Sequence, residues 1–101
     1  MIVAIVRFSL PQAVSLADAT AVYEASAPSY RHVDGLRRKH YLWGDGGRIG
    51  GGVYLWDSRA EAEALYDAAW SARIAPRYGA APTVEYFESP VTVEADTITV
   101  G

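Results

Sequence analysis

Short apolar runs separated by turn residues dominate the pattern of hydrophobic and polar positions along the chain. Residues 2–8 form a nearly unbroken apolar run rich in β-branched side chains, which predicts a strand buried on both faces. Residues 36–43 and 49–56 predict two more strands, joined as a hairpin by a glycine-rich turn. Residues 83–88 predict a fourth strand. The alternating tail 91–100 also has strand character, and we expect it to pair as an edge strand, either within the chain or across a dimer.

Two segments between these strands carry helix signals. Ser15 and Ser58 are each placed to cap a helix N-terminus, and Glu61 completes a capping box with Ser58. The first helix should run to about Ala27, because the residue before Pro28 avoids helical geometry. The second should end in the region of Pro76 and Gly79, and it carries one stripe at helical spacing: Ala62, Leu65, Tyr66, Ala69, Trp70 and Arg73.

The order strand-helix-strand-strand-helix-strand, with a C-terminal extension, predicts an α+β fold of the ferredoxin-like type. We expect residues 1–101 to form a single domain, since this length leaves no room for two cores. Strands one and three should be central, because they are the apolar ones. The triple glycine at 50–52 within the third strand suggests a bulge or a close backbone approach.

The apolar residues of the two central strands alternate onto both faces of the predicted sheet. Val3 and Ile5 point to one face, and Ala4 and Val6 to the other. Two helices can cover only one of these faces. We therefore expect a homodimer packed through its sheet faces.

Composition narrows the possible partners. The net charge of −3 argues against nucleic acid, and the cluster Arg37-Arg38-Lys39 is too short to form a nucleic-acid patch. The absence of cysteine excludes disulfides and sulfur-ligated metals, and the two histidines have no metal-ligand spacing, so we expect no metal. No run approaches the ~20 apolar residues of a membrane helix, and the first run is too short for a signal segment. We expect a cytoplasmic protein with no membrane partner.

Five blocks of the sequence resemble the YdhR-type mono-oxygenase family: DGLRRKHYL at 34–42, GGVYLW at 51–56, AEALY at 62–66, YG at 78–79 and VEYF at 84–87. The first two blocks are the most specific. The resemblance implies a dimeric α/β barrel, in which two ferredoxin-like subunits pack sheet to sheet. It also implies a likeness to the cofactor-free oxygenases of polyketide tailoring. It carries over no catalytic residues, because the same barrel hosts isomerases, haem-degrading enzymes and binding modules.

Aromatic residues concentrate in the second half of the chain. Nine of the twelve fall between positions 41 and 87: Tyr41, Trp43, Tyr54, Trp56, Tyr66, Trp70, Tyr78, Tyr86 and Phe87. Core packing accounts for any single one of them. The excess of tyrosine and tryptophan over phenylalanine favours a pocket for a small hydrophobic or aromatic ligand, since both have a polar group that needs a partner. The expected pocket residues are Tyr54, Trp56, Tyr66 and Trp70.

Two charged or titratable residues are candidates for catalysis. His40, within the second predicted strand, would titrate near neutrality and could act as a general base, although a lone histidine is more often structural. Arg73, on the helical stripe, could bind an anionic or enolate oxygen, or its guanidinium could instead reach solvent at the helix end. His32, in the loop before that strand, should be solvated.

Three functions are compatible with these residues. The first is a mono-oxygenase without cofactor, in which His40 removes a proton from a small aromatic or polycyclic substrate while Arg73 and Tyr66 stabilise the anion. The second is a non-catalytic module of the same fold, with a stress-associated or ligand-binding role. The third is haem binding and degradation with His40 as axial ligand.

Overall fold

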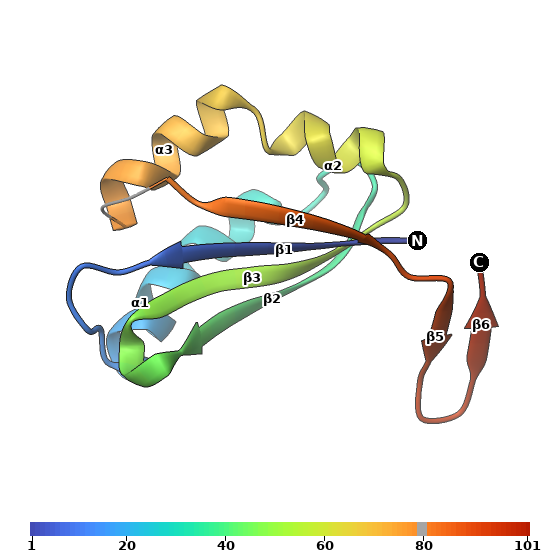
Figure 1. Ribbon diagram of the computed structural model, residues 1–101, viewed down its shortest axis with the longest axis horizontal. Coiled ribbons are helices and arrows are strands. Elements are labelled where there is room, and N and C mark those ends of the chain that lie inside the picture. The colour runs from blue at the N-terminus through green and yellow to red at the C-terminus, as the bar shows by residue number, and fades with distance from the viewer. Residues whose placement is uncertain (79–80) are drawn as a thin grey trace.

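The computed structural model describes residues 1–78 and 81–101, with side chains described for 1–75 and 81–101. The elements, in chain order, are β1 (Ile2–Ser9), α1 (Leu16–Ser26), the 3-10 helix η1 (Ala27–Tyr30), β2 (Leu36–Gly44), the 3-10 helix η2 (Asp45–Gly47), β3 (Ile49–Trp56), α2 (Arg59–Leu65), α3 (Ala68–Tyr78), β4 (Thr83–Glu88), β5 (Val91–Val93) and β6 (Ile98–Val100). Figure 1 shows the helices packed along a twisted sheet. The α+β fold with βαββαβ order is confirmed.

The four-stranded sheet has the order β2-β3-β1-β4 and is antiparallel throughout, so β1 and β3 are central as predicted. Residues opposite one another in the ladders share a face. Ala4 lies opposite Tyr54, and Ile2 lies opposite Trp56. The helices cover this face, and the buried core forms there from Ala4, Val6, Phe8, Tyr54, Trp56, Ala62 and Trp70.

The other face of the sheet, here called the open face, has no covering element among the described residues. The strand registers place these apolar side chains on it: Val3, Ile5, Leu42, Val53, Leu55 and Phe87. Phe87 is 48% exposed and Leu42 is 40% exposed. The expected distribution of apolar side chains over both faces is therefore present in the fold.

The second predicted helix is two helices. The Ser58 hydroxyl accepts a hydrogen bond from the Glu61 backbone N–H at 3.2 Å, as the capping box predicts. The helix ends at Tyr66, whose ψ of 47° leaves the helical region. A new helix, α3, begins after Asp67, whose carboxylate accepts a hydrogen bond from the Trp70 backbone N–H at 2.8 Å. The prediction of one continuous helix with one stripe was therefore wrong. Ala69 is exposed because the break between α2 and α3 changes which residues of α3 face the core.

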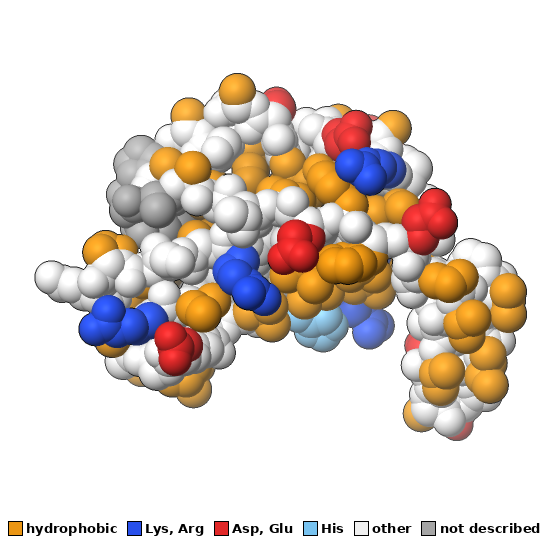
Figure 2. All heavy atoms as spheres, viewed as in Figure 1, with side chains coloured by type: hydrophobic (Ala, Val, Ile, Leu, Met, Phe, Trp, Pro, Cys, Tyr) orange, Lys and Arg blue, Asp and Glu red, His pale blue; other side chains and the backbone are white. Residues whose placement is uncertain are grey.

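The C-terminal tail is not an edge strand of this chain's four-stranded sheet, so that expectation was wrong within the chain, whereas pairing across a dimer stays a prediction. β5 and β6 pair with each other in a separate two-stranded sheet, and this hairpin stands away from the body (Figure 1). Val93, Ile98 and Val100 are 72% to 80% exposed. Apolar side chains gather along the hairpin and over the strands in Figure 2. Over the described part of the chain, no helix has the length and apolar character needed to cross a membrane.

Candidate functional site

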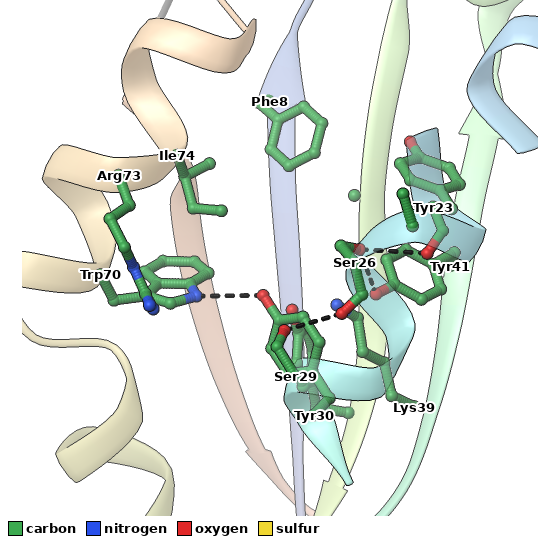
Figure 3. Close-up of a pocket in the computed structure, with 13 residues that line it drawn as sticks. Phe8, Tyr23, Ser26, Ser29, Tyr30, Lys39, Tyr41, Trp70, Arg73 and Ile74 are labelled. Atoms are coloured by element: carbon green, nitrogen blue, oxygen red, sulfur yellow. Dashed lines mark hydrogen bonds between the residues drawn. The ribbon is translucent and has the colours of Figure 1, made fainter. Parts of the chain in front are cut away.

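A pocket of about 410 Å³ lies between the sheet and the helices (Figure 3). β1 and β3 supply its floor, β2 one wall, the α1–η1 segment a second wall, and α3 the opposite wall. Side chains at its surface include Phe8, Tyr23, Tyr30, Lys39, Tyr41, Tyr54, Trp70 and Arg73.

Glycines of β3 make room for these side chains. A Cβ atom at Gly50 would lie 2.6 Å from the Tyr23 hydroxyl and 2.7 Å from the Phe8 ring. A Cβ atom at Gly52 would lie 3.3 Å from Cε of Lys39. At Gly51 a Cβ atom would collide with the backbone carbonyl oxygen of Val6, so the expected close backbone approach is present there. β3 itself carries no bulge.

A bulge in β2 decides which side chains of that strand reach the pocket. The register shifts between Leu36 and Arg38. After the shift, Lys39 lies opposite Tyr54 on the helix-covered face, and His40 lies opposite Val53 on the open face. Lys39 is therefore the residue of this strand that enters the pocket beside Tyr54, and His40 is not.

Three tyrosine rings surround the Lys39 amine and are here called the tyrosine cage: Tyr30, Tyr41 and Tyr54. The Lys39 Nζ lies 3.4 Å from the ring centroid of Tyr30, 3.8 Å from that of Tyr41 and 4.6 Å from that of Tyr54. Ring faces at these distances attract a cation. Within the described residues, no carboxylate forms an ion pair with Lys39.

Burial in this pocket lowers the pKa of Lys39 to about 7. Removing an ammonium group from water disfavours its charged form, and no neighbouring anion compensates. At neutral pH about half of the Lys39 amines are then unprotonated, whereas an exposed lysine with a pKa of about 10.4 is almost fully protonated. An unprotonated amine can accept a proton or act as a nucleophile.

Hydrogen bonds hold the cage rings in place. The Ser26 and Tyr41 hydroxyls lie 2.6 Å apart, and the indole N–H of Trp70 donates to the Tyr30 hydroxyl at 3.2 Å. Tyr23 stacks on Tyr41 with ring centroids 4.6 Å apart. Tyr30 and Tyr41 are thus each positioned by a neighbour from another element.

Of the four aromatic residues predicted to line the pocket, two do so. Tyr54 and Trp70 are at its surface, whereas Trp56 and Tyr66 belong to the adjoining core. Trp56 is fully buried, and its indole N–H donates to the Tyr66 hydroxyl at 3.1 Å. Burial raises the pKa of both Tyr54 and Tyr66, so both phenols are neutral at physiological pH. The Tyr78 side chain lies outside the described residues.

The two residues predicted to be catalytic are separated by the sheet. Arg73, on α3, lines the pocket where its side chain is also exposed to solvent, and it extends beside Trp70 (Figure 3). His40 is exposed on the open face. The sequence reading missed Lys39, although one signal was available: it is the only lysine among nine basic residues.

Over the described residues, no cluster of histidine, cysteine or carboxylate side chains could hold a metal ion. No family model matches the sequence, and no curated protein matches it significantly.

Proposed function

We propose that the protein is a cofactor-independent mono-oxygenase of the YdhR type that oxidises a small aromatic or polycyclic phenol or enol. One observation carries the proposal: the only lysine of the chain has a pKa of about 7 and projects into a pocket with aromatic walls. A base whose pKa is near the working pH is efficient in proton transfer. Lys39 takes the role that the sequence had suggested for His40.

The reaction begins when the Lys39 amine removes a proton from the substrate. The electron-rich carbanion then reduces dioxygen and forms a C–O bond, and Lys39 returns its proton to the distal oxygen to give a hydroperoxide. Loss of a second C–H proton and cleavage of the O–O bond leave a carbonyl group and water. The substrate CH₂ and one O₂ thus become one C=O and one H₂O, with every electron supplied by the substrate.

Arg73 and the cage would assist at different points. The Arg73 guanidinium, where the pocket meets solvent, would stabilise the enolate or phenolate oxygen. Tyr54 and Trp70 would hold the flat substrate between their rings. Protonated Lys39 would be stabilised by the ring faces of Tyr30 and Tyr41 after it accepts the proton.

We also propose that two chains pack through their open faces into a dimeric α/β barrel. The apolar side chains of Ile5, Val53, Leu55 and Phe87 support this arrangement, because a second subunit would remove them from water. The pocket lies on the opposite side of each sheet, so each subunit would hold a complete site.

A second candidate function is non-catalytic binding of an aromatic molecule. It is favoured by the aromatic walls of the pocket, whose tyrosine and serine hydroxyls could hydrogen-bond a polar substituent of such a molecule. The haem hypothesis gains no support from this pocket, because neither histidine lines it.

Oxygen uptake with anthrone-like and naphthol-like compounds, without added flavin or metal, tests the proposal. Wild-type protein should consume oxygen, and Lys39→Met should not. Lys39→Arg keeps a cation in the cage but cannot accept a proton, so it should also be inactive. His40→Ala is the matched control and should retain wild-type turnover.

Two outcomes would count against oxygenation by Lys39. Turnover retained by Lys39→Arg would show that the Lys39 amine is not the base. Quenching of tryptophan fluorescence by the aromatic compounds, with no oxygen consumed, would leave the binding function in its place.

A further inference from the structure

The Lys39 amine is also suited to a second reaction, which does not need dioxygen. We propose that its amine is a carbonyl-capturing nucleophile, which forms an imine with small aromatic aldehydes that enter the pocket. The inference uses the same pocket as the proposed function and goes beyond it, since imine formation needs neither dioxygen nor an acidic substrate proton.

Three features of the site favour this reaction. The amine faces a cavity of about 410 Å³, which can hold one substituted benzene ring beside it. Within the described residues no carboxylate holds the amine in an ion pair, so it is not fixed in the charged state. The rings of Tyr30, Tyr41 and Tyr54 around the amine can also pack against the ring of a bound aldehyde.

The groups that face the amine come from three elements. Tyr30 approaches from η1, Tyr41 from β2 and Tyr54 from β3. Arg73 on α3 is the other cation of the pocket. Its guanidinium would attract an aldehyde with an acidic substituent.

The step is balanced without any redox partner. The lone pair of the Lys39 nitrogen attacks the carbonyl carbon, and the carbonyl oxygen becomes a hydroxyl after transfer of an amine proton. That hydroxyl leaves as water when the C=N bond forms. One amine and one aldehyde give one imine and one water.

Reductive trapping tests this inference directly. The protein is incubated at pH 7 with 4-hydroxybenzaldehyde and sodium cyanoborohydride, which converts each imine to a stable secondary amine. The variant Arg48→Lys, in the exposed turn before β3, supplies a solvated lysine in the same chain as an internal reference. Cleavage after glutamate and tandem mass spectrometry then locate the adducts.

Lys39 should react at least about tenfold faster than the lysine of Arg48→Lys, because far more of it is unprotonated at pH 7. Excess 4-hydroxybenzyl alcohol, which has the same shape without a carbonyl, should suppress the reaction at Lys39 alone. In denaturant the two lysines should react at equal rates. Equal rates in the folded protein, or no suppression by the alcohol, would overturn the inference. If the imine is trapped but no oxygen is consumed, imine formation by Lys39 is supported and the mono-oxygenase proposal is contradicted.

Discussion

Replacing Lys39 by methionine measures how strongly the pocket disfavours a charged amine. The folded chain has a pKa of about 7 at this residue, and an unfolded chain has about 10.4. Between these values the unfolded state binds a proton that the folded state has released. The free energy of unfolding of the wild type therefore rises with pH by about 1.4 kcal/mol per unit.

The free-energy cost of burying the Lys39 charge changes only between two pH values. Below pH 7 both states are protonated, so folding must bury the charge and the full cost remains. Above about pH 10.4 both states are neutral, and the cost is gone. Methionine keeps the unbranched stem and has no charge, so its stability lacks this dependence.

We expect Lys39→Met to be more stable than wild type at pH 7.5. The advantage should shrink by about 2–3 kcal/mol between pH 7.5 and 9.5. Urea unfolding followed by tryptophan fluorescence at several pH values gives both free energies, and other titrating groups cancel in the difference. A difference that stays constant over this range would refute a lowered pKa in the cage.

Three other predictions concern the pocket, the helix break and the open face. Gly52→Ala places a methyl group 3.3 Å from Cε of Lys39, so it should weaken binding of a phenol by about 1–3 kcal/mol; unchanged affinity in a fluorescence titration would contradict this packing. Asp67→Ala removes the cap of α3 and should lower the free energy of unfolding by about 1 kcal/mol, whereas Asp67→Asn should lower it less; equal losses would contradict a capping role. Ile5→Glu should give the 10.9 kDa monomer mass in light scattering where wild type gives twice that mass; a monomeric wild type would contradict the dimer.

The strand order could be predicted from the sequence because burial on two faces leaves a direct mark. The apolar runs of β1 and β3 identify them as central, and the structure has them there. The helix break was missed because Tyr66 and Trp70 fit one helical stripe equally well. Asp67 competes locally by capping a new helix, and such local hydrogen bonds are not visible in periodicity.

The site was predicted in part. Tyr54, Trp70 and Arg73 are in the pocket, as their positions on β3 and on the helical stripe suggested. Lys39 faces the pocket and His40 the open face because one extra residue in β2 reverses the alternation beyond it. A bulge of this kind is fixed by strand pairing, which a single sequence does not reveal.

We expect the Lys39 amine to lose its proton near neutrality, because its burial lowers its pKa to about 7. Because it is the only lysine, selective ¹³C labelling of lysine gives a single Cε signal in the NMR spectrum of the folded protein. Its chemical shift should titrate with a midpoint of about 7. A midpoint near 10.4, the value of a solvated lysine, would show that burial does not lower the pKa of Lys39.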